Sequence, residues 1–148
     1  MKNIDFFKTS PAGMSNMSKM EVYFKETAID PILKELIKTR VSQINGCAFC
    51  LNMHTVDPLK IGETAQRLFL LNAWRETDLF TPAEKAVLDL AEHVTLISET
   101  GVPEEVVTEV LNHFNDKDFV DIMLMIMQIN NWNRINIAMH NDIDPEYK

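Results

Sequence analysis

The segment DPILKELIKTRVSQINGCAFCLNMH, residues 30–54, encodes two consecutive helices and sets the fold class of this 148-residue chain. Asp30 is typical of a helix N-cap and Pro31 of the first helical position. Apolar side chains then recur at helical spacing, at Ile32, Leu36, Ile37, Val41 and Ile44. Gly46 can end this helix, so that the run from Cys47 to His54 begins the next one.

Helical signals continue through the rest of the chain. They predict helices over residues 63–74, from the Thr81–Glu84 capping box to about 97, over 103–111, and over about 117–139 with Asp116 as its cap. Asp57-Pro58 should kink the helix that begins at Cys47 or start another, because proline lacks an amide proton. No segment alternates with the period of two that marks a strand. We therefore expect an all-α fold, a compact single-domain helical bundle over residues 1–148 with its core over about 20–140.

Charge and hydropathy argue against several classes of protein. With 22 acidic and 14 basic side chains, the formal charge of -8 repels nucleic-acid phosphates and anionic lipid surfaces. The longest wholly apolar run, residues 122–127, is far too short to span a bilayer, and residues 1–8 contain no apolar core of signal-peptide length. We expect a cytoplasmic protein that binds neither nucleic acid nor membrane. In that reducing compartment a cysteine pair serves catalysis or metal binding more often than structure.

The expected last helix is apolar on every side between Ile122 and Met127. A helix of that kind should be buried all round. We therefore expect it to be the central helix of the bundle or to be covered in part by another subunit. The flexibility of its methionine side chains suits an irregular packing surface.

Both cysteines of the chain and one of its four histidines fall within residues 47–54. Helical residues three, four and seven apart share a face, so Cys47, Cys50 and His54 form one stripe. A cysteine at a helix N-terminus is biased toward the thiolate, which is the nucleophile. His54 could accept its proton, and a second thiol three residues away can resolve a sulfenic acid into a disulfide. Peroxide reduction needs these groups.

Other chemistries fit parts of the same pattern. Thioredoxin-type oxidoreductases share the cysteine spacing, but their pair follows a strand, and no strand is expected here. Zinc would find three ligands of acceptable type in the stripe, with a fourth from Glu35, another histidine or water. A third interpretation is that the two cysteines are only small buried hydrophobic residues. The other histidines, His93, His113 and His140, are expected to fill surface or core positions.

Glu35 lies twelve residues before Cys47, and the segment from Glu35 to His54 resembles the signature of the alkylhydroperoxidase D branch of the carboxymuconolactone decarboxylase superfamily. The similarity comprises the upstream glutamate, the Ser-Gln-Ile-Asn-Gly-Cys lead-in, the CxxC pair and the histidine four residues after the second cysteine. Further similar parts are Gly62-Glu63, Gln66-Arg67-Leu68, Trp74-Arg75-Glu76, Val102-Pro103 and residues 129–134. Together they cover about residues 20–140.

The resemblance implies a helical bundle of the alkylhydroperoxidase D type that associates through its helices into trimers or hexamers. It also implies a thiol-dependent peroxidase, an antioxidant disulfide oxidoreductase that reduces hydroperoxides with a thiol or dithiol reductant. We expect neither a cofactor nor a metal. By analogy Cys50 is the peroxidatic cysteine, and Cys47 is the proton donor and resolving thiol. Glu35, through a water, and His54 complete a proton relay that generates the thiolate.

One residue departs from the family pattern. The best-known peroxidase members carry a histidine between the two cysteines, where this chain has Phe49. An apolar ring removes one proton-handling group, which implies reduced or redirected peroxidase activity. Two alternatives stay open beside the peroxidase. One is a non-peroxidase enzyme of the same fold that uses Glu35 and His54 for acid–base work on a carbon acid or lactone. The other is a metal-binding or redox-sensing module without turnover.

Overall fold

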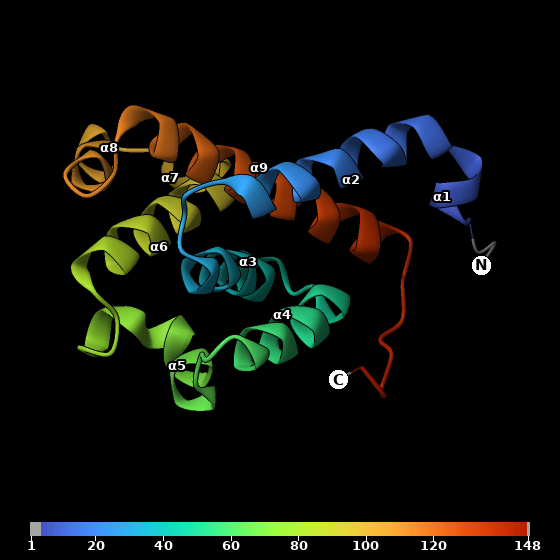
Figure 1. Ribbon diagram of the computed structural model, residues 1–148, viewed down its shortest axis with the longest axis horizontal. Helices are drawn as coiled ribbons and strands as arrows, with labels where there is room; N and C mark the ends of the chain where they lie inside the picture. Colours follow the sequence, from blue (N-terminus) through green and yellow to red (C-terminus); the bar gives the residue numbers. More distant parts are fainter. Residues whose placement is uncertain (1–3, 148) are drawn as a thin grey trace.

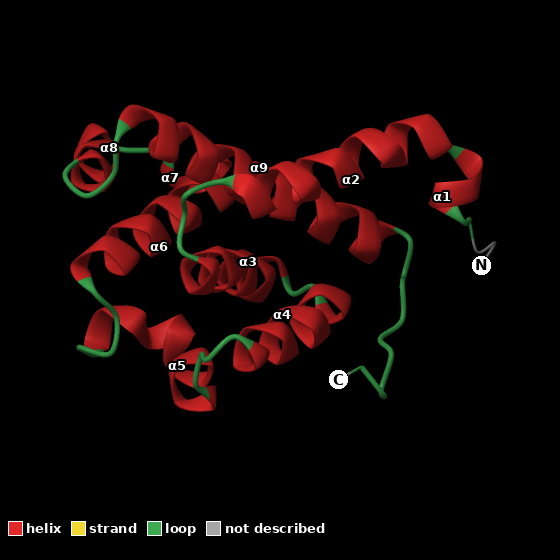
Figure 2. Ribbon diagram, in the orientation of Figure 1, coloured by secondary structure: helices red, strands yellow, loops and turns green. Residues whose placement is uncertain are grey.

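A computed structural model describes residues 4–147, and all of the regular structure in that range is helical (Figures 1 and 2). In chain order the helices are α1 (Phe6–Thr9), α2 (Pro11–Glu26), α3 (Pro31–Asn45), α4 (Ala48–Lys60), α5 (Ala65–Leu70), the 3-10 helix η1 (Leu71–Glu76), α6 (Pro82–Thr95), α7 (Ile97–Thr100), α8 (Glu104–Leu111) and α9 (Asp116–Ala138). The prediction of a compact all-α fold is confirmed. The ends of the expected domain, residues 1–3 and 148, lie outside the described residues.

Helix α3 lies at the centre of the molecule, where it packs against α4, α6 and α9 (Figure 1). Its two apolar faces enter two separate cores. The larger core joins α3 to α6, α8 and α9, and includes Ile37, Val41, Leu90, Val110 and Ile126. The smaller core joins α3 to α5, η1 and α6, and consists of Leu36, Leu68, Leu71, Trp74, Phe80 and Leu88. Two faces of α3 are therefore buried, one in each core.

The predicted helix ends around α3 are confirmed. The Asp30 carboxylate accepts hydrogen bonds from the backbone amides of Ile32 and Leu33, which satisfies two free amides at the start of α3. Gly46 ends α3 in the left-handed conformation, with φ at 67°. A side chain would be strained there, so glycine permits the turn that brings Cys47 directly to the start of α4.

Helix α4 continues through Pro58 to Lys60, so Pro58 does not begin another helix, and the alternative expectation of a kink stays a prediction. Proline leaves the carbonyl oxygen four residues earlier, that of His54, without its helical donor. The Thr39 hydroxyl of α3 lies 2.7 Å from that oxygen and can donate to it. The same hydroxyl also lies 2.7 Å from the Glu35 carbonyl oxygen, so its one proton is shared between two acceptors, and the contact joins α4 to α3 beside His54.

Several other boundaries differ from the prediction. The expected helix over residues 63–74 begins at Ala65 and tightens into η1, and α7 follows α6 as a separate turn. The capping box of α6 is present, with Thr81 and Glu84 bonded reciprocally to each other's backbone amides. The cap of α9 is Asn115 rather than Asp116, since the Asn115 side chain accepts from the amide of Asp118.

The last helix is not buried on every side within this one chain, and the expected cover of part of it by another subunit stays a prediction. Helix α9 is mostly buried between Ile122 and Met127, but Met127 itself is 43% exposed. The central helix is α3, and α9 lies across it with α2 against one side (Figure 1). None of the helices in the described part of the chain has the length and hydrophobicity that a bilayer-spanning segment requires.

Substitution of Asn133 by leucine should destabilise the fold by about 1–3 kcal/mol, because the change unpairs buried polar groups. The Asn133 amide is fully buried, donates to the Ser42 hydroxyl at 3.0 Å and accepts from the Asn45 amide at 2.8 Å. Urea denaturation measures the loss. The matched control is Asn131→Leu, at an exposed position of the same helix, which should stay within about 0.5 kcal/mol of wild type. Equal stability of the two variants would contradict the role of Asn133.

Candidate active site

The cysteine pair lies at the start of α4. Cys47 is the N-cap, and its sulfur accepts a hydrogen bond from the backbone amide of Cys50 at 3.3 Å. The Cα atoms of the two residues are 5.4 Å apart, and their sulfur atoms are placed as a disulfide. Both residues are buried, but only Cys50 lines the adjoining pocket. Cys50 is therefore the sulfur that a ligand in the pocket meets.

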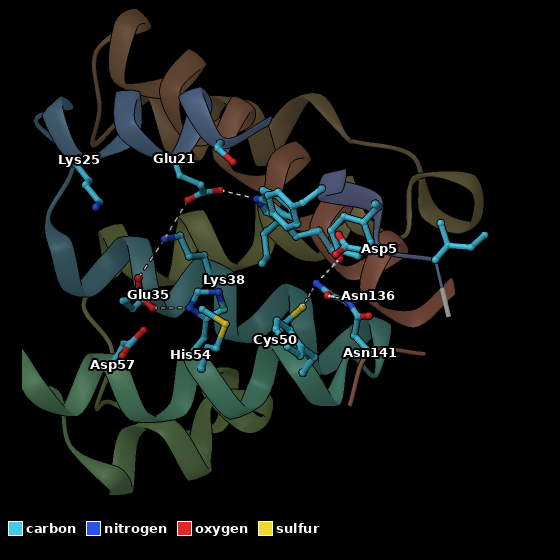
Figure 3. A pocket seen from close by; sticks show the side chains of 18 residues that line it. Asp5, Glu21, Lys25, Glu35, Lys38, Cys50, His54, Asp57, Asn136 and Asn141 are labelled. Carbon is cyan, nitrogen blue, oxygen red and sulfur yellow. Dashed lines mark hydrogen bonds and ion pairs between the residues drawn. The ribbon is translucent and has the colours of Figure 1, made fainter. Parts of the chain in front are cut away.

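The pocket has a volume of about 980 Å³ and lies between the N-terminal helices, α3, α4 and α9 (Figure 3). Its surface is mostly apolar, with side chains from Ile4, Phe6, Phe7, Phe49, Met53, Ile129 and Trp132. Phe49, the residue that departs from the family pattern, forms part of this apolar wall. The pocket is far larger than hydrogen peroxide requires, and it has room for a substrate with an organic substituent.

A chain of charged groups runs along one wall of the pocket. The Glu35 carboxylate lies 2.8 Å from Nδ1 of His54 and 3.2 Å from the Lys38 ammonium group. Lys38 also lies 3.7 Å from the Glu21 carboxylate, which accepts from the indole of Trp132 at 2.9 Å. Helices α2, α3, α4 and α9 thus meet in one network, and Figure 3 shows Glu35 between Lys38 and His54.

The partners of Glu35 keep it ionised. Burial alone would raise the pKa of its carboxyl group. The hydrogen bond and charge of His54, together with those of Lys38, outweigh burial and hold the pKa of Glu35 below its ordinary value. Glu35 is therefore an anion near neutral pH, and it can orient His54 through the hydrogen bond between them.

This lowered pKa predicts a pH dependence of stability. Between the folded-state pKa and the ordinary value of 4.5, the folded protein binds fewer protons at Glu35 than the unfolded chain does. The contribution of Glu35 to stability is therefore full above the ordinary value and is lost as the pH falls through the folded-state pKa. We expect the free energy of unfolding of wild type and of Glu35→Gln, measured in urea from about pH 6 to about pH 3, to converge on acidification. A constant difference would contradict the prediction.

Three of the four predicted site residues, Glu35, Cys50 and His54, line one pocket, and the fourth, Cys47, is buried beside Cys50. Glu35 and His54 form a direct hydrogen bond, and Cys47 contacts Cys50. Within the described residues, no hydrogen bond joins His54 to either sulfur. The Cys50 sulfur instead lies 3.6 Å from the side-chain amide nitrogen of Asn136 on α9. The relay roles of the four predicted residues stay predictions. Asn136 is a site residue that the sequence analysis missed.

The C-terminal segment covers the outer side of α4. The Tyr147 hydroxyl donates to the Asp57 carboxylate, and the Asn52 amide donates to the carbonyl oxygen of Asp144 at 3.0 Å. Asn141, in the same segment, donates to the side-chain oxygen of Asn136 at 2.7 Å. This segment therefore helps to fix the side of the pocket that contains Cys50.

The zinc interpretation has no geometric support in the described residues. No three histidine, cysteine, aspartate or glutamate side chains in residues 4–147 gather in a way that could hold a metal ion. His54 turns its Nδ1 toward Glu35. None of the other three histidines, His93, His113 and His140, lines the pocket; His93 contacts Thr100 and Gly101, and His113 contacts Glu109.

Comparison with known proteins gives close relatives. Residues 10–93 match the Carboxymuconolactone decarboxylase family. The uncharacterised protein YdfG of Bacillus subtilis is 49% identical over 140 residues, which are 95% of each chain. ATU0492 of Agrobacterium tumefaciens, a protein of unknown function with a suggested role as antioxidant defence protein AhpD, superposes with a TM-score of 0.93 at 34% identity over 99% of this chain and all of its own. The debrominase Bmp8 shares the fold, with a TM-score of 0.80 at 17% identity over 94% of this chain and 75% of its own.

The fold and the pocket define a class of all-helical proteins with a cysteine pair at the start of the helix that follows the central one. Within that class, the chain belongs to the carboxymuconolactone decarboxylase family, in its alkylhydroperoxidase D-like branch. The resemblance found in residues 35–54 is thereby confirmed. Bmp8 indicates that the same fold also supports other chemistry.

Proposed function

We propose that this protein is a thiol-dependent peroxidase that reduces organic hydroperoxides through Cys47 and Cys50. One observation carries the proposal: Cys50 of a closely spaced cysteine pair lines a mostly apolar pocket that also contains the hydrogen-bonded Glu35 and His54. Membership of the alkylhydroperoxidase D-like branch supports it, as does the similarity to ATU0492.

In the proposed reaction His54, oriented by Glu35, takes the proton of the Cys50 thiol through a bridging water. The thiolate attacks one peroxide oxygen, the O–O bond breaks, and Cys50 becomes a sulfenic acid. The departing alkoxide takes the proton back from His54 and leaves as the alcohol. The Cys47 thiol then attacks the sulfenic sulfur, its proton leaves with the hydroxyl group as water, and the disulfide forms. A dithiol reductant restores both thiols by exchange, supplying two electrons and two protons.

Access to the pocket supports the assignment of roles within the pair. The backbone amide at the start of α4 faces Cys47, which by itself would favour the thiolate there. Cys47, however, does not line the pocket, whereas Cys50 does. A peroxide in the pocket therefore meets Cys50 first, and Cys47 is placed to resolve the product.

Mass spectrometry of the fully reduced protein after one equivalent of an alkyl hydroperoxide tests the proposal. We expect a loss of two hydrogens, localised to a disulfide between Cys47 and Cys50. Unchanged free thiols would refute it. Steady-state consumption of hydrogen peroxide and of a bulkier alkyl hydroperoxide should then be compared with three reductants: a thioredoxin-like protein, a lipoyl domain and a low-molecular-weight thiol. The apolar pocket favours the bulkier substrate.

The contact between Glu35 and His54 favours one second candidate. A hydrogen-bonded carboxylate and imidazole in an apolar pocket are equipped for proton abstraction from a carbon acid or lactone. That reaction does not need the cysteines. If it is the activity, Cys47→Ser and Cys50→Ser variants should retain most of their turnover of such a substrate, while Glu35→Gln should lose it.

A further inference from the structure

Asn136 is a buried amide on α9 that faces the reactive end of α4. Its side-chain nitrogen lies 3.6 Å from the Cys50 sulfur, and Figure 3 shows the side chain directed at that atom. Asn136 also lines the pocket. The two residues are 86 positions apart in sequence, so the contact comes from the packing of α9 on α4.

The hydrogen-bond partners of Asn136 determine which end of its side-chain amide faces Cys50. The Asn136 nitrogen donates to the carbonyl oxygen of Trp132 at 2.9 Å, and a carbonyl oxygen can only accept. The Asn136 oxygen accepts from the Asn141 amide at 2.7 Å. One of the two amide hydrogens is thus used by Trp132, and the other is directed at Cys50. The group that Asn136 presents to the sulfur is a donor.

Apart from its place in the first turn of α4, Cys50 has surroundings with no excess of positive charge to stabilise an anion. More acidic than basic side chains line the pocket. The acidic residues are Asp5, Glu21, Glu35 and Asp57, and the basic ones are Lys25, Lys38 and His54. The amide at the start of α4 faces the Cys47 sulfur. Within residues 4–147, Asn136 provides the one hydrogen-bond donor to the Cys50 sulfur. A neutral donor stabilises an anion more than it stabilises a thiol or a disulfide.

We propose that Asn136 is the donor that stabilises the thiolate of Cys50 and so places the reactive charge on the pocket-facing sulfur rather than on Cys47. This role of Asn136 rests on the proposed function in one respect only, which is that Cys50 is the reacting thiol. Asn141 is a positioning residue in this arrangement, because it contacts Asn136 and not the sulfur.

The test measures the thiol directly, in a Cys47→Ser background. Serine keeps an N-cap at the start of α4 and leaves Cys50 as the single thiol of the chain. The rate of alkylation by iodoacetamide is followed against pH for the parent, Asn136→Leu, Asn136→Asp and Asn141→Ala. We expect Asn136→Leu to raise the pKa of Cys50 by about one unit and to slow alkylation near neutral pH by about tenfold. Asn136→Asp should raise the pKa further, and Asn141→Ala should raise it less.

The matched control is Asn131→Leu, the same change at an exposed position of the same helix, which should titrate like the parent. Circular dichroism and thermal melting establish whether each variant is folded. If Asn136→Leu does not fold, Asn136→Asp provides the test. A parental pKa of Cys50 in either folded Asn136 variant would overturn the proposal. No peroxide enters this experiment, so a shifted pKa without peroxide turnover would refute the proposed function and leave the role of Asn136 standing.

Discussion

Replacement of Cys50 by serine should reduce hydroperoxide consumption by more than about 10³-fold, because the variant lacks the nucleophile of the proposed reaction. A serine hydroxyl in the same buried position has no comparable anionic form near neutral pH. Steady-state peroxide consumption with a dithiol reductant measures the loss. Retained turnover in Cys50→Ser would contradict the assignment of the peroxidatic residue.

Cys47→Ser is the matched variant of the other member of the pair, and it should fail at a later step. Its Cys50 still reacts once with peroxide, but no neighbouring thiol resolves the product. We expect the sulfenic acid to accumulate, to be trapped by dimedone, and to oxidise further with excess peroxide. A dimedone adduct on Cys50→Ser instead would reverse the roles of the two cysteines.

Glu35→Gln should lower kcat/KM for the hydroperoxide by about 10²- to 10⁴-fold, the range typical of a lost acid–base group. Glutamine can still hydrogen bond to His54, but it has no charge to stabilise the imidazolium that forms when Cys50 is deprotonated. The dependence of kcat/KM on pH is the measurement, and it should lose the ionisation that controls thiolate formation. An unchanged rate would remove Glu35 from the relay.

Two further variants separate a relay from a general effect of charge. Glu21→Gln removes a carboxylate that lies in the same pocket but does not contact His54. It should therefore lower kcat/KM much less than Glu35→Gln does. His54→Gln should lose about as much as Glu35→Gln. The proposed relay uses the two residues as a unit, so the double variant should be little worse than either single variant.

Local signals in the sequence predicted the fold well because they act over a few residues. Asp30, Gly46 and the Thr81–Glu84 capping box all cap their helices as predicted. What these local signals do not reveal comes from contacts between helices. Pro58 stays within α4, and Thr39 of another helix lies against the carbonyl oxygen that proline leaves free. Met127 is exposed because the neighbours of α9 leave that face uncovered, which periodicity along one helix cannot reveal.

The candidate site was predictable where its parts share a segment. Glu35 and His54 are 19 residues apart on adjacent helices, and the resemblance over residues 35–54 identified both. Asn136 had no such signal. It follows Trp132 by one helical turn, just beyond the similar segment 129–134, and only the packing of α9 against α4 directs it to Cys50.

The position of Cys47 as the N-cap of α4 makes the backbone a reporter of redox chemistry. Its sulfur accepts the Cys50 amide proton, so the first hydrogen bond of the helix includes an atom that changes from thiol to disulfide in the proposed reaction. A thiol sulfur and a disulfide sulfur carry different substituents, so the environment of the amide that donates to Cys47 differs between the two states. The Cys50 amide resonance should therefore move between the oxidised and reduced protein, and solution NMR could follow turnover without a dye, a coupled enzyme or a modified thiol.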